Sequence, residues 1–267
     1  VAYSQHFITY AFFFLSISTM LAALRSKRWF WLFLILSLLA EGIHLFTMEY
    51  FWGLELIRPL LIFLLPSISQ ESLRKRLSYT LRNWLPFFAL LLLAVAWRVF
   101  FVQIPEDPNE LRWLQILRET PWLALAQLLQ AIVRDYLYLL FTSWSKTLQP
   151  NLIDIQIPSL TISWGIVLLV GLGTYTFFRL HEDPAGKHPP SPWYRQAILV
   201  GTLAIFMGML PSWLVNRQIM VGFYSDRLAL PAMFGASLWI VGVLEVIVPD
   251  RFYRVIILSG LIGLAAG

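Results

Sequence analysis

Long apolar stretches separated by short polar segments dominate the sequence. The clearest apolar runs cover about residues 3–24, 29–47, 50–66, 84–103, 156–178, 197–215, 228–247 and 252–267. A helix needs roughly 20 apolar residues to cross the ~30 Å hydrocarbon core of a bilayer, and several runs approach that length. The pattern therefore predicts an all-α fold, a polytopic transmembrane bundle of about eight spans.

Residues 121–144 are the ambiguous segment. Gln127, Gln130, Arg134, Tyr138 and Thr142 recur at helical spacing on one side, and leucines fill the other side. Such a two-faced helix is more typical of the membrane interface than of a span.

The charges of the loops favour the interfacial assignment. If 121–144 does not cross, most of the Lys and Arg residues share one face of the membrane, in the segments 25–28, 74–82, 179–195 and 251–254. The positive-inside rule makes that face cytoplasmic. We therefore expect helices 1–4 in residues 1–103, an outer-face subdomain in 104–155 and helices 5–8 in 156–267.

Composition supports the membrane assignment and excludes several functions. Hydrophobic residues make up 58% of the 267 residues and charged residues only 13%. The net charge of +5 is read as loop bias, so no nucleic-acid partner is expected. There is no Cys, no Gly-rich phosphate loop, no His-Glu-x-x-His and no Gly-x-Ser-x-Gly elbow.

The chain begins at Val1 and ends inside an apolar run, which we interpret as a fragment whose last helix is truncated. Membrane lipids are its expected surroundings. The bacterial inner membrane is the expected location, with the site facing outward.

A polar hinge between two apolar runs is the strongest candidate site. It holds Asn216, Arg217, Tyr224, Asp226 and Arg227. Ionisable groups at the mouth of membrane helices are costly, so they usually serve a polar ligand, a partner charge or an ion path. The simpler alternative is a local Asp226–Arg227 pair with a snorkelling Arg217.

Further acidic and basic residues lie near the ends of the second and third apolar runs. Glu55 and Arg58 are three residues apart and can pair on one helix face. Glu41 and His44 share a face and are expected in a helix–helix contact. Glu49 has no basic residue closer in sequence than Arg58, so we expect it to face a water-filled cavity near the hinge.

The order of these features resembles the C-type multi-pass membrane glycosyltransferases. The nearest pattern is that of the tetratricopeptide-containing protein O-mannosyltransferases and their bacterial relatives. The matching segments are Met48-Glu49, Ala96-Trp97-Arg98, Leu137–Leu140 through to Pro150, Met209-Leu210-Pro211 and Asp226–Pro231. The last segment departs from the pattern, with Asp226 in place of Glu and Ala229 where an aromatic residue is expected.

The resemblance implies a polyprenyl-phosphate sugar as donor and transfer at the outer membrane face. It assigns Arg227 and Arg217 to the donor phosphate, Tyr224 to a neighbouring hydrogen bond and Asp226 to orienting Arg227. Glu49 becomes a metal-binding or positioning acid, with Arg58 and Arg98 as secondary residues.

The resemblance leaves other features open. The main catalytic acid would precede Val1. A divalent cation is compatible with this chemistry, and the acceptor stays open. The alternatives are a transporter or flippase for a lipid-linked or amphipathic solute, and a membrane protein without catalysis.

Overall fold

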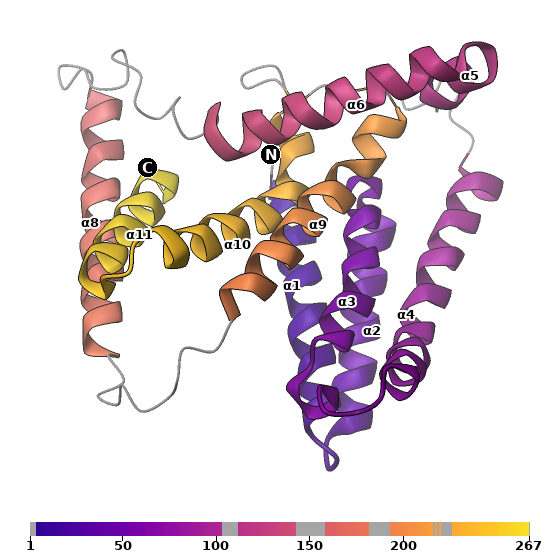
Figure 1. The fold of residues 1–267 in the computed structure, drawn as a ribbon, viewed down its shortest axis with the longest axis horizontal. Helices are drawn as coiled ribbons and strands as arrows, with labels where there is room; N and C mark the ends of the chain where they lie inside the picture. The colour runs from indigo at the N-terminus through magenta and orange to yellow at the C-terminus, as the bar shows by residue number, and fades with distance from the viewer. Residues whose placement is uncertain are drawn as a thin grey trace. The chain divides into compact units, whose positions relative to one another are not determined.

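The computed structural model describes residues 4–102, 112–142, 158–181, 193–215, 217, 219 and 226–266. Every regular element in these ranges is a helix, which confirms the all-α prediction (Figure 1). The α-helices are α1 (Ser4–Arg25), α2 (Phe30–Thr47), α3 (Arg58–Phe63), α4 (Leu73–Phe101), α5 (Arg112–Glu119), α6 (Pro121–Leu137), α8 (Pro158–Leu180), α9 (Trp193–Leu214), α10 (Leu230–Ile247) and α11 (Arg251–Ala266). The 3₁₀-helices are η1 (Glu49–Ile57), η2 (Pro66–Ile68) and η6 (Asp226–Ala229), and a π-helix, η3, covers Tyr138–Thr142.

Seven helices in the described ranges are long and apolar enough to cross a membrane. They cover Gln5–Arg25, Phe30–Thr47, Leu73–Phe101, Pro121–Thr142, Leu160–Leu180, Trp193–Leu214 and Arg227–Ile247. The chain is therefore a multi-pass membrane protein by the length and composition of its helices.

The chain divides into two compact units. Unit 1 comprises Val1–Tyr136 and Thr202–Gly235, and unit 2 comprises Leu137–Gly201 and Ala236–Gly267. Each unit therefore combines segments from different sides of the predicted boundaries at residues 103 and 155.

In unit 1, α1 and α2 form a helical hairpin, and η1, α3 and α4 pack against it. Large apolar side chains fill the spaces between these helices, including Phe13, Met20 and Phe51, each no more than 1% exposed. Gly53 lies against the backbone of α9. A Cβ atom there would come within 1.8 Å of the Met207 carbonyl oxygen, so only glycine allows this approach.

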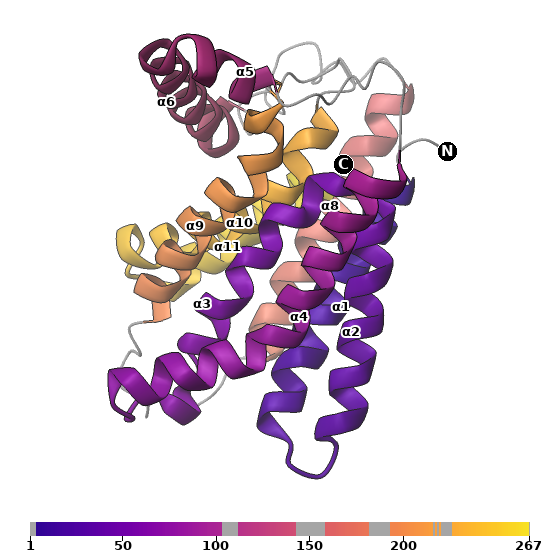
Figure 2. The same cartoon turned by 90° about the vertical axis from the view of Figure 1, so that its right-hand side faces the viewer.

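The predicted span at 50–66 is not one regular α-helix. Its first part is the 3₁₀-helix η1, and α3 continues it over only six residues, so that the two run together beside α4 (Figure 2). A 3₁₀-helix rises about 2.0 Å per residue against 1.5 Å in an α-helix, so this short run covers roughly 27 Å, close to a bilayer core. Pro59, in the first turn of α3, fixes where the α-helix begins.

Helix α6 runs crosswise to α1 and α2 within unit 1, as the two ribbon views together show (Figures 1 and 2). Two hydrogen bonds anchor it. The Trp113 indole N–H on α5 donates to the Ala124 carbonyl at 3.0 Å, and the Tyr136 hydroxyl donates to the Thr202 carbonyl on α9 at 2.5 Å. The predicted position of this helix along the membrane surface stays a prediction.

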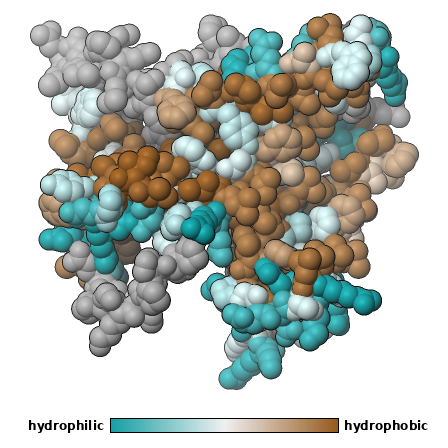
Figure 3. Space-filling model, viewed as in Figure 1, coloured by the Kyte–Doolittle hydropathy of each residue, from teal (hydrophilic) through white to brown (hydrophobic). Residues whose placement is uncertain are grey.

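The outer surface of the helices is apolar over most of their length. Leu39 on α2 and Leu92 on α4 are more than half exposed, as are Leu168 and Leu169 on α8. Figure 3 shows hydrophobic side chains over the middle of unit 1 and hydrophilic ones at its lower end, where α1 turns into α2 and α4 begins. The basic segments 25–28 and 74–82, which the loop charges place on one face of the membrane, therefore lie at the same end of this unit.

Candidate functional site

A cavity of about 260 Å³ lies in unit 1 where α6 meets the end of α9. Two arginines, two tryptophans and two glutamines line it, together with two small or apolar residues: Trp113, Gln127, Leu128, Gln130, Ala131, Arg134, Trp213 and Arg217. Ligand pockets for drug-sized molecules span roughly 300–1,000 Å³. This cavity is therefore slightly smaller than a typical pocket for a drug-sized molecule.

A buried carboxylate holds two of the lining side chains in place. Asp135 is 1% exposed, and one of its oxygens accepts hydrogen bonds from the Arg134 Nε and Nη2 atoms at 2.9 and 2.8 Å. Its other oxygen accepts the Trp213 indole N–H at 2.9 Å. Asp135 thus connects α6 with α9 and sets the positions of a guanidinium and an indole at the cavity wall.

The side chains that line the cavity determine which chemical groups of a ligand it can bind. The N–H groups of Trp113 and Trp213 are both used within the protein, so neither donates to a ligand, and Trp213 is 3% exposed. Guanidinium groups form paired hydrogen bonds with phosphate oxygens, and carboxamides can donate to and accept from hydroxyl groups. The cavity therefore suits a small ligand that carries both a phosphate and a ring with hydroxyls.

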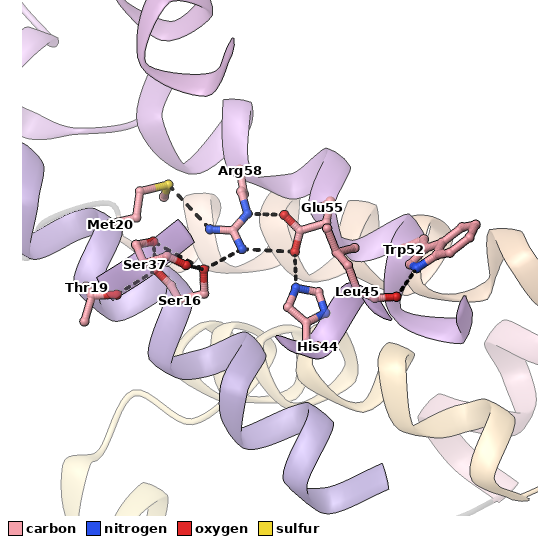
Figure 4. A network of polar contacts seen from close by, with 9 residues as sticks. All are labelled: Ser16, Thr19, Met20, Ser37, His44, Leu45, Trp52, Glu55 and Arg58. Atoms are coloured by element: carbon pink, nitrogen blue, oxygen red, sulfur yellow. Dashed lines mark hydrogen bonds and ion pairs between the residues drawn. The ribbon is translucent and has the colours of Figure 1, made fainter. Parts of the chain in front are cut away.

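A second polar constellation lies in the helical core of unit 1, and it is fully buried (Figure 4). Arg58 from α3 is 0% exposed and forms an ion pair with Glu55 from η1. The same guanidinium donates to Ser16 Oγ on α1 at 2.9 Å, and its carbon lies 4.7 Å from the ring centre of Phe87 on α4. His44 on α2 completes the network through a 2.7 Å contact between its Nε2 and Glu55 Oε1.

This network confirms the predicted pairing of Glu55 with Arg58. The pair also joins helices. The Arg58 guanidinium of α3 contacts α1 and η1, and the Glu55 carboxylate contacts His44 on α2. Ser16 and Ser37 add a direct contact between α1 and α2, where the Ser37 hydroxyl donates to the Ser16 carbonyl at 2.6 Å. His44 and Glu41 lie in this interhelical region as expected, and Glu41 is 0% exposed.

Glu49 has a basic partner that its sequence neighbours do not reveal. It forms an ion pair with Arg98 near the end of α4, and the side chains are 41% and 17% exposed. The expectation of an acid without an adjacent cation is therefore wrong, because packing brings α4 to the start of η1.

The structure does not bring the two arginines of the predicted hinge site together at the cavity. Arg217 lines the cavity, and its backbone N–H donates to the Ser212 carbonyl at 2.9 Å. Arg227 is half-buried in η6 and begins the candidate span Arg227–Ile247, as predicted, but it is not among the residues that line the cavity. Tyr224, Asn216 and the Asp226 side chain lie outside what the structure describes.

The sequence did not predict this cavity. It placed Gln127, Gln130 and Arg134 on the polar face of an interfacial helix and named Arg217 as a phosphate contact, and the structure brings these four residues together at the cavity. Asp135 and Trp213 were missed because they are 78 residues apart, and no local pattern indicates their hydrogen bond.

Within the described ranges, no three His, Asp or Glu residues gather in a way that could hold a metal ion. The described residues therefore do not fit the divalent cation that the family resemblance left open.

No family model matched the chain, and comparisons with curated proteins and with solved structures found no similar protein.

Proposed function

We propose that this chain is the membrane core of a glycosyltransferase that uses a polyprenyl-phosphate sugar as donor and acts at the outer membrane face. The observation that carries the proposal is the unit 1 cavity, in which Arg134 and Arg217 lie together with two indole rings. The loose likeness to C-type glycosyltransferases supports the same substrate class.

The cavity residues divide into two roles in this proposal. Arg134 and Arg217 contact the donor phosphate, while Trp113 packs against the sugar ring and Gln127 and Gln130 bind its hydroxyls. Transfer forms a bond between the acceptor hydroxyl oxygen and the anomeric carbon and breaks the bond between that carbon and the phosphate oxygen. Polyprenyl phosphate leaves, and the hydroxyl proton passes to solvent. Negative charge grows on the phosphate at that moment, and preorganised guanidinium groups stabilise it.

Binding to variants of the full chain in lipid nanodiscs tests the phosphate role. We expect Arg217→Ala to weaken binding of polyprenyl-phosphate mannose or polyprenyl-phosphate glucose by about ten- to a hundredfold, the value of a charge-assisted hydrogen bond. Arg217→Lys should restore part of the loss, since a point charge replaces a bidentate fork. Arg118 is exposed on α5 and does not line the cavity, so Arg118→Ala is the matched control.

The sugar role has its own measurement. We expect Trp113→Leu to weaken binding of the sugar-bearing lipid while leaving binding of polyprenyl phosphate without sugar unchanged. Equal affinities of Arg217→Ala and Arg118→Ala for the donor would contradict the proposal. Loss of donor binding in Arg227→Ala alone would move the phosphate site from the cavity to η6.

A transporter or flippase is the second candidate, and one observation favours it. Buried ionisable groups inside a membrane core often mark proton or ion paths, and the His44–Glu55–Arg58 network is such a group. Proteoliposomes separate the two functions. A glycosyltransferase cleaves the donor and releases polyprenyl phosphate, whereas a flippase moves intact donor to the other leaflet.

A further inference from the structure

Among the described residues, the buried cluster around Arg58 holds two acidic side chains, Glu41 and Glu55, and one arginine. Arg58 is paired with Glu55, and Glu41 interacts electrostatically with both of them. All three side chains and His44 are no more than 1% exposed. The packed helices contribute neutral groups to these contacts: Ser16 and Met20 from α1, Phe13 from α1 against the His44 ring, and Phe87 from α4.

Charge balance requires one proton in this cluster. The Arg58 guanidinium and the Glu55 carboxylate neutralise each other. An ionised Glu41 would leave a net negative charge in a region closed to solvent, which is strongly unfavourable. With Glu55 ionised against Arg58, the compensating proton is carried by Glu41 or His44.

The hydrogen bonds of His44 decide against the imidazole. A neutral ring with its proton on Nε2 donates to Glu55, and its bare Nδ1 loses little by lacking a partner. A protonated ring would also bury an N–H donor at Nδ1, and this atom has no acceptor among the residues that the structure describes. Leaving a buried donor unsatisfied is costly.

The surroundings of Glu41 favour its neutral form. No N–H donor in the described part of the chain reaches either of its oxygens, and the side chain with which it interacts most directly is the Glu55 carboxylate. A buried carboxylate is stabilised by N–H donors or a close cation, and the Arg58 guanidinium is already directed at Glu55. A protonated acid has no net charge and tolerates this position far better.

We infer that the core of unit 1 is a proton-binding site in which the Glu41 carboxyl holds one proton beside the Glu55–Arg58 ion pair. The proton can leave only if water or a further cation reaches α2, so its release is coupled to opening of the α1–α2–α3 packing. This inference rests on the buried cluster and is independent of the glycosyltransferase proposal.

Infrared spectroscopy of the full chain in lipid tests the site directly. At neutral pH we expect a C=O stretching band of a protonated carboxylic acid that shifts on transfer to D₂O and is lost in Glu41→Gln. Glu49→Gln is the matched control, because Glu49 is an exposed acid paired with Arg98, and the band should persist in it. A band that survives Glu41→Gln, or one absent from the unsubstituted protein, would overturn the inference.

Thermal unfolding gives a second test that does not depend on the spectrum. Gln replaces a neutral acid without changing charge, so Glu41→Gln should unfold at the temperature of the unsubstituted protein. Glu55→Gln should unfold at a markedly lower temperature, because it leaves the Arg58 charge buried and unbalanced. Equal losses in the two variants, or failure of Glu41→Gln to fold while Glu49→Gln folds, would show that Glu41 is ionised and overturn the inference.

Discussion

Two helix contacts, one in each unit, hold membrane helices together by different means. In unit 2, α8 packs on α11 through glycines, and a Cβ atom at Gly263 would lie 2.6 Å from the Val167 carbonyl oxygen and 3.2 Å from Gly171 Cα. In unit 1, α1, α2 and α3 meet through serines and the Glu55–Arg58 pair. Close backbone approach and interhelical hydrogen bonds are the two usual ways to join helices in lipid.

This difference between glycine packing in unit 2 and ion pairing in unit 1 indicates a role for the buried Glu55–Arg58 charges. The α8–α11 contact packs apolar helices mainly through glycines, with a cation–π contact in which the Arg179 guanidinium lies 5.9 Å from the Phe252 ring centre. A buried ion pair is weak support for stability, since a well-packed apolar pair often replaces it without loss. The charges of unit 1 therefore point to a role beyond helix association, which agrees with binding of a proton at Glu41.

The largest expected effect comes from breaking the ion pair in unit 1. Arg58→Met keeps an apolar stem of similar length but leaves the Glu55 carboxylate without its cation. We expect a loss of about 3–5 kcal/mol in the free energy of unfolding, measured by denaturant titration in mixed micelles. The double variant Glu55→Gln/Arg58→Met removes both charges and should recover most of this loss. If the double variant were as unstable as Arg58→Met, the loss would come from the other contacts of the guanidinium, with Ser16 and Phe87, and not from the unbalanced charge.

The glycine contact of unit 2 should respond to size and not to charge. Gly263→Leu is expected to cost about 1–3 kcal/mol, because the side chain would push α11 away from α8. Gly260 lies in the same helix and has open space around its Cα, so Gly260→Ala is the matched control. It should stabilise the helix by up to about 1 kcal/mol. Thermal unfolding measures the stability of both variants. If Gly263→Leu were as stable as Gly260→Ala, close packing of α8 on α11 at Gly263 would be contradicted.

The serine contact between α1 and α2 is expected to have the smallest effect of the three. Ser37→Ala removes the hydrogen bond to the Ser16 carbonyl, and such bonds within membranes contribute on average about 0.6 kcal/mol. Lys75→Ala is the control, since Lys75 and Glu71 form a surface pair with 74% and 49% exposure that should contribute less. If Ser37→Ala were no more destabilising than Lys75→Ala, the polar contact would have no role in stability.

Local patterns predicted the parts of this molecule that depend on local physics. Apolar runs were sufficient for the helices, and a spacing of three residues was sufficient for the Glu55–Arg58 pair. Helical periodicity also placed Gln127, Gln130 and Arg134 on one face. The change from 3₁₀- to α-helix at Arg58 was not predicted, because η1 packs against segments that are distant in sequence, as Gly53 does against Met207.

Pairs that are distant in sequence could not be predicted in the same way. Glu49 and Arg98 are 49 residues apart, and Asp135 and Trp213 are 78 apart. Their contacts depend on how α4 meets η1 and how α6 meets α9. One sequence carries no signal for such packing.

Photoaffinity labelling of the full chain in lipid is the most direct test of the proposed donor site. The probe is a polyprenyl-phosphate sugar with a photoreactive group on the sugar, and mass spectrometry identifies the labelled peptides. Labelling is expected at Trp113, at the α6 face of Gln127 and Gln130, and at Trp213, and unlabelled donor should suppress it. Labelling confined to α8 and α11 of unit 2, or labelling that excess donor does not suppress, would contradict the proposal.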